Sequence, residues 1–259
     1  MKRILILFIS LFALTAAFAS ELPEDNTTIS FTGPSGQTSS YRIYGDHLEE
    51  DSAPYGLLVY LHGDGADEFD DAQSKTLQAY ADIARKHNLL MIAPKTPDRG
   101  SLTWWKKESS PTYLSELLQE VYRRYPIDKS RIWLVGYSGG AETISYNLLT
   151  DHSNLFQGGG ALLIGGGGFS NDTSFGLKPS SQLKQNFVLK WLIGEKDTDG
   201  QEEADPGFDA LDAAKQAYRR YRNEGFSASL EIVPNVGHYN INREYGPATL
   251  DKLITNRGQ

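Results

Sequence analysis

The sequence RIWLVGYSGGAETISYNLL, residues Arg131–Leu149, decides the fold. Its first part is apolar and rich in β-branched and aromatic side chains, which predicts a buried strand, and its last part predicts a helix. Between them, residues 136–140 read G-Y-S-G-G, a G-x-S-x-G motif. A turn at this place is so tight that only glycine fits at its flanks, and its strain exposes the Ser138 hydroxyl at the end of the sheet. Ser138 is therefore a candidate nucleophile, with an ordinary glycine-rich turn as the alternative.

The N-terminus has the three parts of a secretory signal peptide. Lys2 and Arg3 form a basic start, Ile4–Phe18 is apolar, and Ala17-Phe18-Ala19 matches the small-x-small cleavage pattern. We expect a signal peptide over residues 1–19 and one domain over residues 20–259. The alternative is an uncleaved anchor, although the apolar stretch is short for a membrane span.

Composition excludes several classes of partner and site. The chain has no cysteine, which excludes disulfides, a thiol nucleophile and zinc sites built on thiolates. It has 25 basic and 33 acidic residues, and removal of Lys2 and Arg3 with the signal peptide leaves a net charge of 23 − 33 = −10. This charge repels nucleic acid and anionic lipid, so we expect neither nucleic-acid binding nor stable membrane association after cleavage.

Predicted strands and helices alternate along most of the chain. Two short runs, Thr28–Thr32 and Ser40–Tyr44, predict an antiparallel hairpin at the edge of the sheet. Continuous apolar runs then predict buried strands at Gly56–Leu61, Leu89–Ala93, Ala161–Ile164, Phe187–Ile193 and Ala228–Val233. Helical stripes of apolar residues separate several of these strands, and a last short helix is expected over Ala248–Thr255.

This order predicts the α/β class, with a mostly parallel central sheet, helices on both faces and the N-terminal hairpin at one edge. No composition shift marks a second domain. Phe169–Lys184 and Thr198–Gly207 lack an obvious element, and neither is long enough for a large lid.

A serine nucleophile needs a base and a carboxylate that orients the base. Among the five histidines, His238 lies just beyond the predicted strand Ala228–Val233, where active sites of open parallel sheets are found. We assign His238 as the base, against the alternative of a surface histidine. The carboxylate is expected after strand Phe187–Ile193. Asp197 is preferred there, and Asp199 and Glu195 remain alternatives.

Acyl transfer also needs donors for an oxyanion. One is expected to be the Gly139 N–H, directly after the nucleophile. The second is expected from the His62–Gly65 loop after strand Gly56–Leu61, with the Asp64 N–H preferred over that of Gly65. The Asp64 side chain is then expected to point away, and His62 to orient the loop without acting as a base.

The sequences LHGDG (61–65), YPIDKSRIWLVGYSGG (125–140), GEKD (194–197) and VPNVGH (233–238), with Trp104-Trp105, resemble the α/β-hydrolase superfamily. The likeness is strongest to secreted, lidless esterases of the polyhydroxybutyrate depolymerase and feruloyl esterase type. It implies hydrolysis of carboxylic esters through an acyl-enzyme intermediate. The chain departs from many members in having Ser138-Gly139-Gly140 in place of Ser-Ala-Gly-Gly, and it lacks the disulfides common in the family.

Three aromatic residues are candidate substrate contacts. Trp104 and Trp105 lie in a loop at the same predicted end of the sheet and are suited to stacking on an aromatic acyl group or a sugar ring. Core packing is the alternative for both. Tyr137, inside the G-x-S-x-G motif, is a further candidate for the pocket wall.

No cofactor or metal is expected. The glycine runs at 158–160 and 165–168 match no nucleotide-binding motif, and the acidic residues over 197–203 lack the order of a calcium loop. We therefore expect a secreted or periplasmic serine esterase acting on a small or polymer-borne ester, with acyl groups on polysaccharide or polyhydroxyalkanoate as possible substrates. The alternatives are a serine peptidase on the same fold and a non-catalytic module that binds carbohydrate or a cell surface.

Overall fold

The computed structural model describes residues 22–105, 109–169, 178–201, 204 and 206–257. The predicted signal peptide lies outside these residues. The strands are β1 (Thr27–Thr32), β2 (Thr38–Tyr44), β3 (Tyr55–Leu61), β4 (Leu89–Pro94), β5 (Ile127–Tyr137), β6 (Gly159–Ile164), β7 (Phe187–Gly194) and β8 (Ser227–Val233). The α-helices are α1 (Asp67–Asp70), α2 (Lys75–Lys86), α3 (Ser110–Arg124), α4 (Gly139–Thr143), α5 (Leu149–Asp151), α6 (Ser181–Asn186), α7 (Ala210–Asn223) and α8 (His238–Arg257).

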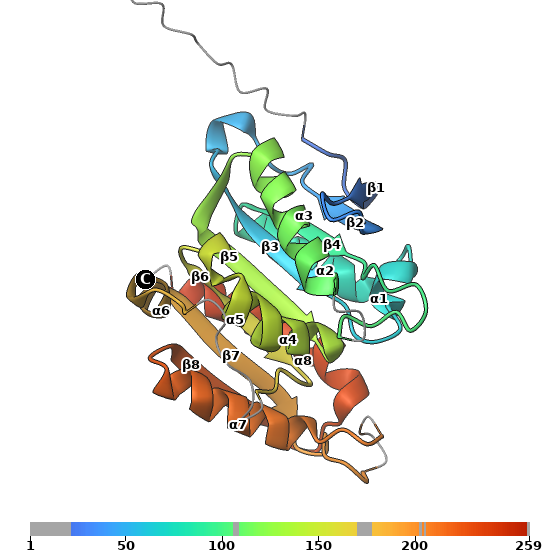
Figure 1. Ribbon diagram of the computed structural model, residues 1–259, viewed down its shortest axis with the longest axis vertical. Coiled ribbons are helices and arrows are strands. Elements are labelled where there is room, and N and C mark those ends of the chain that lie inside the picture. Colours follow the sequence, from blue (N-terminus) through green and yellow to red (C-terminus); the bar gives the residue numbers. More distant parts are fainter. Residues whose placement is uncertain (1–21, 106–108, 170–177, 202–203, 205, 258–259) are drawn as a thin grey trace, which may run out of the picture.

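Within the described residues, the strands form one eight-stranded sheet in the order β1-β2-β4-β3-β5-β6-β7-β8. The hairpin β1-β2 pairs antiparallel, and β2 joins β4 antiparallel, whereas the strands from β4 to β8 pair in parallel. Figure 1 shows the twisted sheet running through the molecule. The predicted α/β class, the parallel sheet and the edge hairpin are confirmed.

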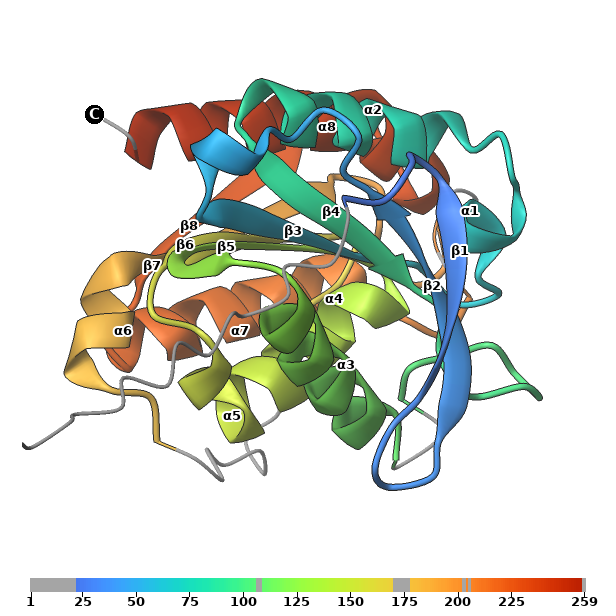
Figure 2. The same ribbon diagram turned by 90° about the horizontal axis from the view of Figure 1, so that it is seen from above.

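Helices cover both faces of the sheet (Figure 2). Helices α2 and α8 lie on one face, and α3, α4, α5 and α7 lie on the other. Strand β3 shows why, because Leu57, Val59 and Leu61 enter the core under α3 while Leu58 and Tyr60 enter the core under α2. Since successive side chains of a strand point to opposite faces, a strand that is apolar throughout needs a cover on both sides.

Two elements are longer than the sequence pattern predicts. Strand β5 begins at Ile127, where its polar first half continues the ladder with β3 across a register shift near Tyr55. Helix α8 begins at His238 and continues through Pro247, whereas the sequence pattern predicts a short helix from Ala248. The Gly246-Pro247 pair predicts a helix boundary, but Gly246 instead lets the helix approach α2: a Cβ there would lie 2.1 Å from the Tyr80 hydroxyl.

Two further segments differ from the expectation. The segment after Ser138 is helical to Asp151, but its middle, Ile144–Leu148, is a π-helical turn. Helix α6 begins at Ser181, inside the stretch for which no element was predicted, and Ser180 caps it by accepting a hydrogen bond from Leu183 N–H at 3.0 Å.

The described residues contain no separate lid domain, and no described helix is long and apolar enough to cross a membrane.

Candidate active site

Ser138 lies on a strained turn between β5 and α4. Its backbone has φ 49° and ψ −119°, a left-handed region that is costly for a residue with a Cβ. The flanking glycines permit the turn, because a Cβ on Gly136 would lie 2.6 Å from Ala141 N and one on Gly140 would lie 2.3 Å from Leu61 O. This is the packing that the G-x-S-x-G motif predicts, and it places Ser138 at the carboxyl end of the central strand β5.

Asp197 and His238 form a buried pair at the ends of the neighbouring strands β7 and β8. The His238 Nδ1 lies 3.0 Å from Asp197 Oδ1 and 2.9 Å from Oδ2, and the residues are 3% and 0% exposed. The Asp197 backbone is fixed in turn, since its N–H donates to Gly194 O and its carbonyl accepts from Leu211 N–H. A carboxylate at Nδ1 keeps the proton on that nitrogen and leaves Nε2 as the basic nitrogen.

The sequence offers three carboxylates as candidate partners of His238, and the structure distinguishes among them. Asp199 is exposed, and its Oδ1 accepts a hydrogen bond from Gly207 N–H at 3.0 Å. Glu195 is also exposed and accepts from Asn235 N–H at 3.0 Å. Only Asp197, among these three, contacts the His238 ring.

The His238 ring is packed against the turn that carries Ser138. The Tyr137 hydroxyl donates to His238 O at 3.1 Å, and the two ring centroids are 5.2 Å apart. Gly165, after β6, lies behind the ring, where a Cβ would be 3.2 Å from His238 Nδ1. Within the described residues, no hydrogen bond joins the side chains of Ser138 and His238, and the hydrogen bonds of the His238 ring go to Asp197.

His62 has a structural environment after β3. It is 1% exposed, its Nδ1 donates to Gly63 O at 2.6 Å, and its Nε2 accepts from Thr96 N–H at 3.1 Å. This pattern requires a neutral ring, and burial lowers the pKa of His62 to about 4. His62 thus fixes the loop by hydrogen bonds, the role predicted from its position directly after β3.

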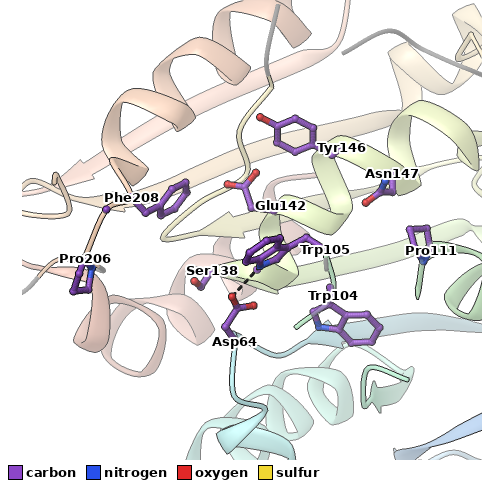
Figure 3. A pocket seen from close by; sticks show the side chains of 12 residues that line it. Asp64, Trp104, Trp105, Pro111, Ser138, Glu142, Tyr146, Asn147, Pro206 and Phe208 are labelled. Atoms are coloured by element: carbon purple, nitrogen blue, oxygen red, sulfur yellow. Dashed lines mark hydrogen bonds between the residues drawn. The ribbon is translucent and has the colours of Figure 1, made fainter. Parts of the chain in front are cut away.

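Asp64 lies at the tip of that loop, beside Gly139. A Cβ on Gly139 would be 2.2 Å from Asp64 Oδ1, and Asp64 Oδ2 accepts a hydrogen bond from Trp105 Nε1 at 2.9 Å (Figure 3). The carboxylate therefore packs against the residue after Ser138. The expectation that the Asp64 side chain points away is wrong. The physical reason is a contact among residues that are distant in sequence: Gly139 leaves the space, and the Trp105 N–H supplies a donor.

The two tryptophans have different environments. Trp104 is fully buried, its Nε1 donates to His62 O at 3.2 Å, and its ring packs on that of His62. Trp105 is 56% exposed. Both line the cavity beside Ser138, so core packing and substrate contact are compatible for Trp104, and Trp105 lies at the surface of the site.

The cavity beside Ser138 has a volume of about 790 Å³. Its described lining includes Ser138, Asp64 and both tryptophans, but Tyr137 lies on the His238 side and does not line it. Lining residues that were not predicted from the sequence include Glu142, Tyr146, Asn147 and Phe208. The position of Glu142 could have been predicted from the sequence. A residue four positions after Ser138 lies one helical turn further on the same face of the helix.

Glu142 is a largely buried carboxylate in the cavity wall. Its Oε1 accepts hydrogen bonds from Gly167 N–H at 2.9 Å and from Gly168 N–H at 3.0 Å. Burial raises the pKa of Glu142 from 4.5 to about 7, the two N–H groups oppose this rise, and the nearby Asp64 adds to it. Glu142 thereby ties α4 to the glycine loop that passes behind His238.

One described group offers three oxygen or nitrogen ligands to a metal, namely Asp25, Asp46 and His47. The Arg85 guanidinium already forms ion pairs with Asp25 at 2.8 Å and with Asp46 at 3.1 Å. The Arg85 guanidinium thus already supplies a positive charge to these two carboxylates. None of the three residues of this group lines the cavity beside Ser138.

Three features together define the α/β-hydrolase fold: the sheet order, the strained serine after β5, and the Asp197–His238 pair after β7 and β8.

No family model and no curated protein matches the sequence. Solved structures do match the fold. A thermostable esterase has a TM-score of 0.60 and 17% identity, over 91% of this chain and 60% of that chain. This chain therefore spans less than two thirds of the length of that esterase.

Two further structures match over nearly their whole length. XC6422 from Xanthomonas campestris, an α/β serine hydrolase without a lid, has a TM-score of 0.58 and 16% identity over 92% of this chain and 97% of its own. The poly(3-hydroxybutyrate) depolymerase LpqC from Bordetella parapertussis has a TM-score of 0.57 and 13% identity over 88% and 94%. At these identities the likeness establishes the fold, which confirms the predicted α/β-hydrolase architecture.

Proposed function

We propose that the chain is a serine hydrolase that cleaves carboxylic esters through an acyl-enzyme intermediate on Ser138. The observation that carries this proposal is the buried Asp197–His238 pair, packed against the turn that holds Ser138 in a strained backbone conformation. The α/β-hydrolase fold and the esterases among its structural neighbours support the reaction class.

In the proposed acylation step, Ser138 Oγ attacks the ester carbonyl carbon while its proton passes to His238 Nε2. Asp197 stabilises the imidazolium that forms. The tetrahedral intermediate then expels the alcohol, which takes the proton from His238. The backbone N–H groups of Gly139 and Asp64 are the proposed donors to the oxyanion, since they come directly after Ser138 and at the tip of the β3 loop.

In the proposed deacylation step, His238 takes a proton from water, and the hydroxide equivalent attacks the acyl carbon. The acid leaves, and the proton returns to Ser138 Oγ, which restores the free enzyme. No cofactor or metal takes part in this scheme.

The substrate is proposed to be an ester outside the cytoplasm, in agreement with the predicted signal peptide. Trp105, with its exposed ring at the cavity, supports a substrate that presents a flat group. Acyl groups on polysaccharide and polyhydroxyalkanoate chains are the polymer-borne candidates.

The test is hydrolysis of short p-nitrophenyl esters by wild type and by Ser138→Ala, followed by a screen of acetyl, feruloyl and hydroxybutyrate esters. We expect turnover by wild type and none above background by Ser138→Ala, with unchanged cooperative unfolding. Ester hydrolysis that survives in Ser138→Ala contradicts the proposal. Cleavage of aminoacyl amides without ester turnover favours the peptidase alternative.

A further inference from the structure

Four consecutive glycines, Gly165–Gly168, form a glycine loop directly after strand β6, and the proposed mechanism gives them no role. Gly165 and Gly167 have φ values of 57° and 87°, a left-handed conformation that favours glycine. Glycine loses more conformational freedom on folding than any other residue, so a run of four has a large entropic cost. Such a loop keeps one conformation only if other groups hold its backbone.

The glycine loop runs between the proposed base and the proposed nucleophile. A Cβ on Gly165 would lie 3.2 Å from His238 Nδ1 and 3.4 Å from Asp197 Oδ2. A Cβ on Gly166, the next residue, would lie 3.0 Å from Ser138 O. The backbone of the loop therefore packs against all three residues of the proposed triad, and it limits where the His238 ring can lie relative to Ser138.

Glu142 anchors the glycine loop. Its Oε1 accepts hydrogen bonds from Gly167 N–H at 2.9 Å and from Gly168 N–H at 3.0 Å, and its Oε2 also accepts from Gly168 N–H at 3.0 Å. A second anchor comes from β7, where Trp191 Nε1 donates to Gly167 O at 2.7 Å. Glu142 belongs to α4, which begins directly after Ser138, so its carboxylate ties the loop to the nucleophile turn (Figure 3).

We propose that Glu142 is a positioning residue: its carboxylate holds the glycine loop, and the loop holds the His238 ring within reach of Ser138. The inference rests on the proposed esterase function and adds to it a residue outside the proposed triad. A displacement of a catalytic group by about 1 Å can lower a rate about a hundredfold, so loss of the carboxylate is expected to affect the chemistry through the loop. A residue that only stabilises the fold would lower the free energy of unfolding and leave kcat unchanged.

The test compares Glu142→Leu, which removes both acceptor oxygens, with Glu142→Gln, whose amide oxygen can take the place of Oε1. The substrate is p-nitrophenyl acetate, which has a small acyl group. For Glu142→Leu we expect kcat to fall about a hundredfold while KM stays within about threefold of wild type, because the change acts on the transition state. For Glu142→Gln we expect kcat within about fivefold of wild type, because Oε1 alone accepts a bond from each loop N–H.

Asp251→Leu is the matched control. The Asp251 carboxylate also ties two elements together, because it lies on α8 and pairs with Lys86 and His87 at the end of α2. It is not among the described residues that line the cavity beside Ser138. We expect Asp251→Leu to lower the free energy of unfolding and to leave kcat within about twofold of wild type.

A second readout does not depend on turnover. The His238 Nδ1 proton lies in the hydrogen bond to Asp197, and we expect it to give a downfield NMR signal, identified by its absence in His238→Ala. This signal is expected to shift or disappear in Glu142→Leu, because the ring is no longer held against the glycine loop. It is expected to stay in place in Glu142→Gln and Asp251→Leu.

An unchanged kcat in folded Glu142→Leu overturns the inference, and so does an equal loss of kcat in Glu142→Leu and Asp251→Leu. A loss in Glu142→Gln as large as that in Glu142→Leu also overturns it, because the loop bonds are then not the cause. If Glu142→Leu does not fold, Glu142→Asp decides, since it keeps the charge but withdraws the oxygens from the loop. For this variant we expect kcat to fall about tenfold or more, and an unchanged kcat overturns the inference.

Failure of the proposed function has a different result. If wild type hydrolyses no ester, the proposed function is overturned, and the NMR signal of His238 alone tests the positioning role. A signal that is the same in Glu142→Leu, or in Glu142→Asp if the first variant does not fold, as in wild type then overturns the inference.

Discussion

Asp197 Oδ2 lies 2.9 Å from His238 Nδ1, although the two residues are 41 positions apart in the chain. They meet because β7 and β8 are parallel neighbours whose carboxyl ends lie at the same edge of the sheet. Ser138 comes from the end of β5 at that edge, and Asp64 from the loop after β3. The site is thus assembled by the strand order, and short loops set its geometry.

Removal of the Asp197 charge is expected to disable the histidine without unfolding the protein. In Asp197→Asn the carboxamide no longer fixes the proton on Nδ1, so we expect kcat for a p-nitrophenyl ester to fall about a thousandfold or more. Asp199→Asn is the control, because Asp199 is exposed and bonded to Gly207 N–H, and its kcat is expected to stay close to that of wild type. A larger loss in Asp199→Asn than in Asp197→Asn would show that the acid is misassigned.

Gly140→Ala is expected to destabilise the fold. The new Cβ would lie 2.3 Å from Leu61 O, a backbone atom of β3 that cannot move without disturbing the sheet. We expect the free energy of unfolding in urea to fall by about 2 kcal/mol or more. Gly100→Ala is the control: its closest neighbour is Asp98 Oδ1 at 3.5 Å, and a change within about 0.5 kcal/mol is expected. Equal stability of the two variants would contradict the packing argument.

Glu142 is expected to make stability depend on pH between about 4.5 and 7. Its pKa rises from 4.5 to about 7 in the folded protein, so the folded state holds this proton more tightly than the unfolded state. The stabilisation is complete below pH 4.5 and is lost as the pH rises through 7. Relative to Glu142→Gln, wild type is expected to lose up to about 3 kcal/mol of unfolding free energy across this range. If the difference in unfolding free energy between wild type and Glu142→Gln does not vary with pH, the raised pKa of Glu142 is contradicted.

Much of the sheet, and the choice of Ser138, Asp197 and His238 as candidate site residues, follow from local pattern. Continuous apolar runs mark strands that are buried on both faces, and β3 and β4 are such runs. The G-x-S-x-G motif after a strand predicts the strained turn at Ser138, because only glycine fits at its flanks. The preference for Asp197 came from its position after β7, and the contact with His238 supports it.

The remaining features depend on contacts that no local pattern contains. The carboxylate of Asp64 lies where it does because Gly139 leaves a space and Trp105 offers a donor, and these three residues are distant in sequence. Likewise, the polar start of β5 is held by its ladder with β3 rather than by its own strand propensity. Tertiary context overrides weak local preferences in such cases.

The most direct test of the central claim is covalent labelling with a fluorophosphonate, read by mass spectrometry of the tryptic peptides. We expect one adduct, on Ser138, that is absent in Ser138→Ala and forms far more slowly in His238→Ala, because the base no longer activates the hydroxyl. An adduct on another residue would contradict the assignment of Ser138 as the nucleophile. The absence of any adduct on wild-type protein that is folded, as shown by cooperative unfolding, would contradict this assignment as well.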